Sequence, residues 1–481
     1  MEYTIKTKPG IVNILSLLFV FAGIFIFFQG AHPVVPWDGD DWGTLNSYSR
    51  HAFPSWGTWN PSRIFPEVFG PVTGYFAAYV VYPLQGDYVQ SISLCISLLL
   101  ATATTVFFYT LCRVFFTLSK KEGVSIFTGL LVMVLYFLIF KSKADNNFYM
   151  LWSYNLCTVF YYVLPNLINS ALVCYFIDKR LNHQNIQLTE NTIVKYSLLV
   201  FVLYYACFSI LWGSSILAAF IFYEIVFGIV AHKFSGYWNE TLKYNKVYLF
   251  VILLFFTYCI FEFFGGRSEL LQKTQSAGLS ASLAQFMLLA KQTEVLFLGF
   301  SILALVAAVV VRFRAKEANP AIQLVIRSLI CMVSLTIFYI LATIKAGPEF
   351  ASRIESVYGV YFFLILAVAL SVVYVITKYP VAFIALPVLV SILFVETTRS
   401  YKPYSFGNWT DTPSLKKYNY MTSWIAQVKK ADKEGKTSVT IKYPANLGVW
   451  FGAMSEALYA HNIITKPIQI NTEKVEETKK P

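Results

Sequence analysis

The chain has 481 residues, of which 57% are hydrophobic and only 13% are charged. A soluble globular protein carries about 25% charged residues, so this composition excludes an ordinary soluble enzyme, a disordered protein and a disulfide-stapled secreted domain. The formal net charge of +12 gathers at the ends of apolar segments and in residues 397–481. This pattern is typical of orientation in a membrane rather than of nucleic-acid binding. We therefore predict an all-α polytopic membrane protein.

Apolar segments long enough to cross a bilayer recur along residues 1–396, which we predict to be the transmembrane domain. A further apolar segment at 64–84 contains three prolines and two glycines, and we predict that it lies in the membrane interface without crossing. The eleven crossing helices are predicted at 11–29, 89–112, 124–140, 154–177, 194–211, 213–231, 247–264, 293–311, 322–343, 357–377 and 380–396.

The distribution of Lys and Arg predicts the orientation of these helices. If the N-terminus is cytoplasmic and 64–84 does not cross, the basic clusters at 113–121, 179–180 and 312–316 all face the cytoplasm, as the positive-inside rule requires. The same orientation places a long first loop, residues 30–88, on the outer side. It also makes the C-terminal segment extracytoplasmic.

Residues 397–481 are predicted to form a small α/β soluble segment that packs as a cap on the membrane domain. We expect a strand at 438–443, a second helix at 454–460 and a frayed end at 473–481. A first helix before Gly435 is indicated by the helical spacing of five apolar residues, Leu415, Tyr418, Trp424, Ile425 and Val428.

The strongest chemical feature is an acidic turn shortly after the first predicted span. Asp38, Asp40 and Asp41 lie within four positions and are flanked by Trp37 and Trp42. Tryptophan favours the level of the lipid headgroups, and a carboxylate held beside an apolar surface has a raised pKa that suits a general base. The alternative is a solvated acidic turn with two interfacial anchors.

Arg63 and Glu67 stand at the start of the broken segment 64–84. The guanidinium of Arg63 presents several donors that suit a phosphate at the membrane surface. The alternative is an arginine at a helix end that only extends its charged group to the water at the membrane surface.

Further outer loops repeat this mixture of acidic, amide and basic side chains. Exposed ion pairs contribute only ~0–1 kcal/mol, so we expect these residues to line a polar cavity for a phosphorylated or hydroxylated ligand. The residues concerned are Asp145 and Asn146, Arg267 and Glu269, and Arg353.

Many spans, a long first outer loop and an acidic motif soon after the first span together resemble the GT-C superfamily of membrane glycosyltransferases. The sequence Asp40-Asp41-Trp42, followed by Arg63 before a broken helix, most resembles the bacterial and phage O-antigen glucosyltransferases that convert serotype. The resemblance implies a polyprenyl-phosphate sugar donor, with glucose as the expected sugar. It also implies a hydroxyl acceptor on a lipid-linked or O-antigen glycan, and inversion, at the outer face of the bacterial inner membrane.

The resemblance further implies roles for individual residues. Asp40 is expected to be the general base, with Asp38 in support and Asp41 either positioning the acceptor or raising the pKa of Asp40 by like-charge repulsion. Arg63, with Arg267 and Arg353, is expected to neutralise the leaving phosphate. Some members of the superfamily bind a metal through this motif, and three carboxylates also permit a Mg²⁺ or Mn²⁺ ion.

Two other functions stay open at the level of sequence. A transporter of lipid-linked sugars or polysaccharide would need residues on both membrane faces, including Glu224, the one clear acidic residue deep inside a predicted span. An O-antigen polymerase would also work on the outer face, but it would lengthen a glycan rather than decorate it.

Overall fold

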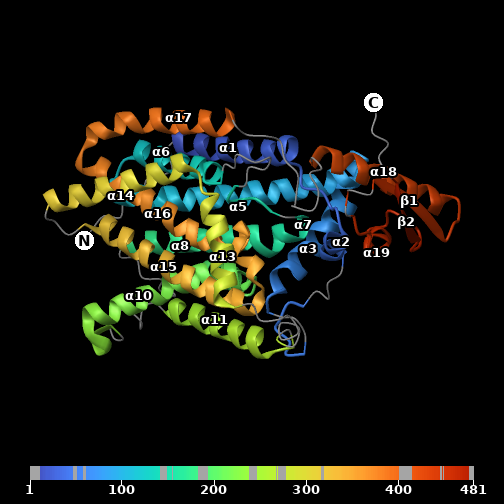
Figure 1. Cartoon of the computed structure of the whole chain (residues 1–481), viewed down its shortest axis with the longest axis horizontal. Coiled ribbons are helices and arrows are strands. Elements are labelled where there is room, and N and C mark those ends of the chain that lie inside the picture. The colour runs from blue at the N-terminus through green and yellow to red at the C-terminus, as the bar shows by residue number, and fades with distance from the viewer. Residues whose placement is uncertain are drawn as a thin grey trace.

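The computed structural model describes residues 11–46, 51–57, 61–140, 149–153, 155–182, 193–237, 246–266, 268, 278–315, 319–399, 414–444, 447 and 449–475. Within these residues, ten helices are long and apolar enough to cross a membrane. The chain is therefore an all-α, multi-pass membrane protein. Figure 1 shows most of the long helices running side by side, with the C-terminal segment beyond one end of the bundle.

The helices of the bundle follow one another along the chain with short turns between several of them. The first half comprises α1 (Ile11–Ile26) with η1 (Phe27–Ala31), α5 (Tyr88–Ser119), α6 (Glu122–Leu138), α7 (Leu156–Thr158), η3 (Val159–Val163), α8 (Leu164–Leu181) and α9 (Ile193–Cys207). The second half comprises α10 (Leu211–Tyr237), α11 (Lys246–Phe264), α13 (Leu279–Lys291), α14 (Val295–Ala315), α15 (Pro320–Ala346), η6 (Pro348–Ser352), α16 (Ile354–Lys378), η7 (Pro380–Ile384) and α17 (Ala385–Arg399).

Nine of the eleven predicted spans coincide with helices of spanning length. The other two, at 124–140 and 194–211, correspond to the shorter apolar helices α6 and α9. The tenth helix of spanning length in the described chain is Ile64–Gln85, the segment that the sequence predicts to be broken and interfacial.

This segment is one continuous helical run, although Pro71 lies inside α3, where a proline removes a backbone hydrogen bond. It consists of α3 (Ile64–Phe76), η2 (Ala77–Val81) and α4 (Tyr82–Gln85). Pro66 lies in the first turn, where the backbone N–H has no partner in the helix anyway, and Pro83 follows the wide π-turn η2.

The position of α3 nevertheless fits an interfacial helix. The N–H of Phe65 donates to the carbonyl of Phe208, just beyond the end of α9, at 3.1 Å, and α4 leads directly into the start of α5. Figure 1 shows α3 running across the ends of the long helices. The non-crossing path and the count of eleven crossings stay predictions.

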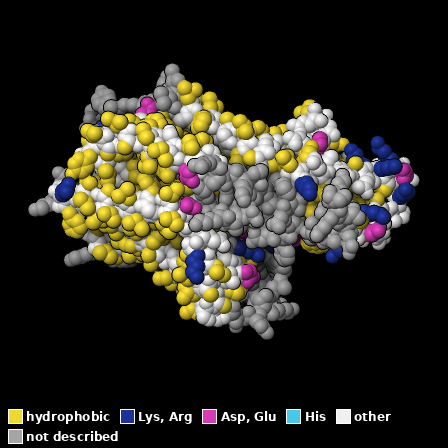
Figure 2. All heavy atoms as spheres, turned by 45° about the horizontal axis from the view of Figure 1, so that its top comes forward, with side chains coloured by type: hydrophobic (Ala, Val, Ile, Leu, Met, Phe, Trp, Pro, Cys, Tyr) yellow, Lys and Arg dark blue, Asp and Glu magenta, His cyan; other side chains and the backbone are white. Residues whose placement is uncertain are grey.

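Burial divides the bundle into a central and a peripheral set of helices. The spanning windows of α8 and α16 are 83% buried, whereas those of α11, α14 and α17 are at most 28% buried. The peripheral helices expose apolar side chains, which cover the bundle in Figure 2, while Lys, Arg, Asp and Glu gather over the C-terminal segment. A lipid solvent around the bundle accounts for this distribution.

The C-terminal segment, residues 414–475, contains two helices and two strands. They are α18 (Ser414–Lys433), β1 (Ser438–Pro444), α19 (Met454–Ala460) and β2 (Gln469–Val475). The strands pair in parallel, with Ser438 opposite Gln469. The first three elements lie where the sequence predicts them, but β2 is not predicted and extends into residues expected to fray.

Candidate functional site

The acidic turn, residues 37–42, is built around α2 (Gly39–Asn46). The Oδ1 of Asp38 accepts the N–H of Asp41 at 3.1 Å, and the Oδ2 of Asp41 accepts the N–H groups of Trp37 at 2.7 Å and Asp38 at 3.4 Å. This reciprocal arrangement is a capping box made by two aspartates. Asp38 and Asp41 thereby hold the first turn of α2 in place.

The same two carboxylates join α2 to the start of α7, more than a hundred residues later in the chain. The N–H of Cys157 donates to the Oδ1 of Asp41 at 2.7 Å, and the Nδ2 of Asn155 donates to the Oδ2 of Asp38 at 3.0 Å. A negative charge is stabilised at helix N-termini. Asp41, whose side chain is fully buried, lies between two of them.

The second half of α2 packs closely on α3. A Cβ atom added to Gly70 would lie 2.5 Å from the carbonyl oxygen of Thr44. Trp42 is fully buried with its ring 6.3 Å from that of Tyr88, and Trp37 is 6% exposed. Both indoles therefore pack inside the protein, and their level in the membrane stays a prediction.

The C-terminal segment covers the acidic turn directly. The rings of Trp37 and Trp424 are 5.6 Å apart, and a Cβ atom on Gly39 would lie 2.7 Å from the ring of Trp450. Only a glycine at position 39 allows this approach.

Lys417 on α18 reaches into the same place, and sequence reasoning missed it. Its side chain is 2% exposed, and its Nζ lies 5.2 Å from the centroid of the Trp37 ring. Burial lowers the pKa of Lys417 to about 8, although the charges of Asp41 and Asp38 oppose this shift.

His32 and its partner Tyr149 are a second pair of side chains that sequence reasoning missed, and the charge of Lys417 acts on His32. The Tyr149 hydroxyl hydrogen-bonds to the Nδ1 of His32, which is fully buried. Burial, and then the charge of Lys417, lower the pKa of His32 to about 3, so the imidazole is neutral at physiological pH.

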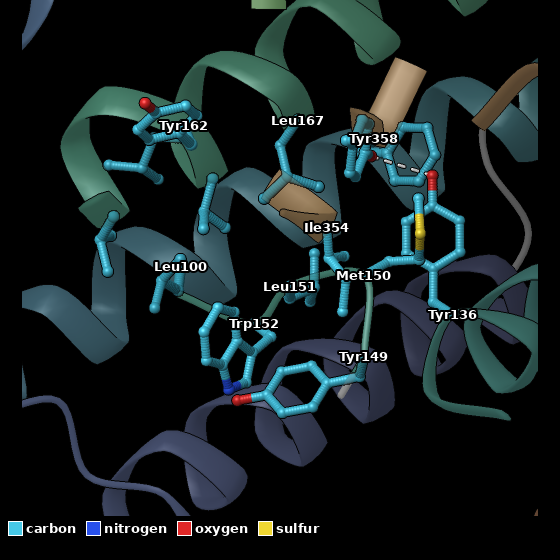
Figure 3. Close-up of a cluster of buried hydrophobic side chains, with 14 of the residues drawn as sticks. Leu100, Tyr136, Tyr149, Met150, Leu151, Trp152, Tyr162, Leu167, Ile354 and Tyr358 are labelled. Atoms are coloured by element: carbon cyan, nitrogen blue, oxygen red, sulfur yellow. Dashed lines mark hydrogen bonds between the residues drawn. The ribbon is translucent and has the colours of Figure 1, made fainter. Parts of the chain in front are cut away.

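Tyr149 belongs to a buried segment, 149–153, that returns into the bundle. Its Met150 N–H donates to the carbonyl of Tyr136 at 2.9 Å. Figure 3 shows the segment among side chains of α5, α8 and α16, near the 2.9 Å hydrogen bond between the hydroxyls of Tyr136 and Tyr358. The core thus fixes the backbone that presents Tyr149 to His32.

The three aspartates differ in their surroundings. Burial raises the pKa of Asp41 well above its usual value, and the charge of Asp38 adds to this effect, against the hydrogen bonds from Cys157, Trp37 and Asp38. Burial also raises the pKa of Asp38. Asp40 is exposed to solvent on the first turn of α2. The exposed carboxylate of Asp40 therefore stands on a turn held by the half-buried Asp38 and the buried Asp41.

The other predicted site residues fall into two groups. Arg63 pairs with the buried Glu67 at 3.8 Å on the first turn of α3, and the guanidinium of Arg353 lies 4.5 Å from the centroid of the Phe350 ring. Four of the predicted residues lie outside the described part of the chain: Asp145, Asn146, Arg267 and Glu269.

The Asp38–Asp41 pair does not fit a divalent-cation site. Each of the four carboxylate oxygens already accepts a backbone or amide N–H, and the ammonium of Lys417 lies nearby. No group of three or more His, Cys, Asp or Glu side chains suited to a metal ion occurs among the described residues. No step is therefore assigned to a Mg²⁺ or Mn²⁺ ion.

The fold defines a multi-pass helical membrane protein with a buried ionic site at one end of its bundle. Comparisons of the chain with protein-family models, with curated proteins and with solved structures give no match.

Proposed function

We propose that the protein is a GT-C-type glycosyltransferase. It transfers a sugar, glucose in the first instance, from a polyprenyl-phosphate donor to a hydroxyl of a lipid-linked or O-antigen glycan. The reaction takes place at the outer face of the bacterial inner membrane, with the N-terminus in the cytoplasm. The observation that carries the proposal is the exposed carboxylate of Asp40 on a turn that Asp38 and Asp41 hold rigidly.

Asp40 is the best candidate for the general base. Asp40 is exposed on the first turn of α2, where an acceptor hydroxyl can reach it, whereas Asp41 is fully buried between two helix N-termini. As the acceptor oxygen attacks the anomeric carbon, Asp40 takes the hydroxyl proton. The bond from the anomeric carbon to the phosphate oxygen breaks on the opposite face, the polyprenyl phosphate leaves with the electron pair, and the configuration inverts.

Arg63 is the best candidate to stabilise the leaving phosphate. It lies at the start of α3, which packs against α2, and it pairs with the buried Glu67 at 3.8 Å. A guanidinium suits the charge that develops on phosphate in the transition state.

The test uses the full chain in proteoliposomes with polyprenyl-phosphate glucose and isolated O-antigen glycolipid. Replacing Asp40 with Asn keeps the size of the side chain and removes the base, so we expect the transfer rate to fall by about 10²–10⁴-fold. Glu456→Gln is the matched control, because Glu456 is an exposed acid on α19. Mass analysis of the product should show one added hexose.

Three results decide between the open functions. Transfer by Asp40→Asn at the unaltered rate would remove the proposed base. A ladder of repeat units in the product would indicate a polymerase. Movement of the glycolipid across the membrane without a new glycosidic bond would indicate a transporter.

A further inference from the structure

Lys417 occupies a position where an apolar side chain would be expected. The buried face of α18 carries Met421, Trp424 and Val428 at helical spacing, and Lys417 continues the same stripe one turn earlier. Lysine is almost never fully buried unless its charge is paired. A buried lysine in an apolar stripe therefore indicates a specific need for a positive charge.

The charges on the other side of the interface supply that need. The half-buried Asp38 and the buried Asp41 are two acidic groups close together, and each acts electrostatically on Lys417. The C-terminal segment thus brings one positive charge to a pair of negative ones. The Trp37 ring, 5.2 Å from the Nζ of Lys417, adds a favourable contact for an ammonium group.

Resting on the proposed function, we propose that Lys417 is a positioning residue of the transfer site: its ammonium keeps the Asp38–Asp41 pair ionised and so fixes the turn that carries Asp40. Two like charges buried side by side take up a proton when no cation compensates them. A protonated carboxyl oxygen is a donor and no longer accepts an N–H at that site. Losing the Lys417 charge therefore loosens the cap of α2 and displaces Asp40.

The proposal predicts opposite responses of activity and stability to pH. Asp41 and Asp38 on the acidic turn act on the charge of Lys417. Lys417 in turn acts on His32, to which Tyr149 is hydrogen-bonded. The pKa of Lys417 is lowered from 10.5 to about 8, so activity should fall as the pH rises through 8. The lowered pKa contributes stability that is present above pH 10.5 and is lost as the pH falls through 8. As the pH rises through 8, the C-terminal segment should thus dock more tightly while the transfer activity falls.

The experiment compares Lys417→Met, Lys417→Arg and the control Lys416→Met in the full chain in proteoliposomes. Lys416 is the exposed neighbour of Lys417 on α18. Resistance of the C-terminal segment to protease reports docking, and kcat and KM are measured across pH 6–10, a range of about two units on either side of the expected pKa.

We expect Lys417→Met to stay docked, to keep the KM for the donor and to lose about 100-fold in kcat, the size typical of a misplaced catalytic group. Lys416→Met should match the wild type. Lys417→Arg should keep activity and lose the decline above pH 8, because arginine stays charged.

Two results would overturn the role of Lys417 and leave the proposed function intact. One is a docked Lys417→Met protein with the kcat of the wild type. The other, which does not depend on how well that variant folds, is an alkaline decline shared by the wild type and Lys417→Arg. If the wild type transfers no sugar, the proposed function itself fails, and the role of Lys417 fails with it.

Discussion

The continuous helix formed by α7, η3 and α8 has a cluster of charged side chains at each end. At its start, Asp38 and Asp41 lie with Lys417, which gives two acidic groups and one ammonium. At its last turn, Glu224 on α10 accepts from the guanidiniums of both Arg180 and Arg327, which gives one carboxylate and two cations. The two clusters are therefore opposite in composition and in net charge.

The difference lies in what the charged groups hold. In the Glu224 cluster, side chains on α8, α10 and α15 bind one another, which locks three helices together. In the acidic cluster, the carboxylates hold backbone N–H groups of two helix N-termini and leave a third carboxylate, Asp40, exposed. The first arrangement serves the fold, and the second presents a group to solvent.

Replacing Glu224 with Gln tests the structural reading of its cluster. Two guanidiniums then remain in the bundle without their carboxylate, which costs about 3–5 kcal/mol for a buried pair. We expect the lower end for the free energy of unfolding, because Arg180 is 34% exposed. The measurement is denaturant unfolding in detergent micelles.

Activity per folded molecule should be unchanged in Glu224→Gln, with Glu456→Gln as the exposed control. If Glu224→Gln keeps its stability but abolishes movement of glycolipid across the membrane, the comparison fails and the transporter alternative gains support.

Replacing Asp41 with Ala removes the acceptor shared by two helix N-termini. Loss of one cap costs about 1 kcal/mol, so we expect the free energy of unfolding to fall by about 2 kcal/mol. Transfer activity should fall as well, because the turn beneath Asp40 is released. Stability equal to that of the wild type would mean that the hydrogen bonds of Trp37 and Cys157 to Asp41 contribute nothing.

An exposed ion pair sharpens the contrast with both buried clusters. Lys442 and Glu473 pair at 3.3 Å between β1 and β2, with their side chains 67% and 51% exposed. Lys442→Gln should change the free energy of unfolding by less than about 0.5 kcal/mol, and high salt should remove even that difference. A change as large as that of Glu224→Gln would show that burial does not set these energies.

The sequence was most informative where the signal is local. The apolar segments predicted the long helices because about 20 apolar residues in a row have few alternatives to a membrane helix. The three aspartates were found together because four consecutive positions necessarily lie close in space. The prolines of 64–84 predicted a broken helix, but Pro66 and Pro83 fall at tolerated positions and α3 continues through Pro71.

The sequence was least informative where the site is assembled over long distances. The contacts of Asp41 with Cys157 and of Trp37 with Lys417 depend on the path of the whole bundle, which no spacing encodes. One signal was present: Lys417 lies on the apolar stripe of α18. The apolar face predicted from the sequence began instead at Leu415, which is 57% exposed. The predicted face was therefore rotated about the helix axis, and Lys417 was not recognised as part of it.

The position of α18 after α17, which ends at Arg399, also sets an order of assembly. The ribosome makes the acidic turn just after the first helix but reaches Lys417 only after every helix of the bundle. At 5–20 residues per second, the interval is about 20 to 75 seconds. A nascent chain therefore carries Asp38 and Asp41 without their counter-ion during this time, and the proposed site is complete only when translation has passed the last helix.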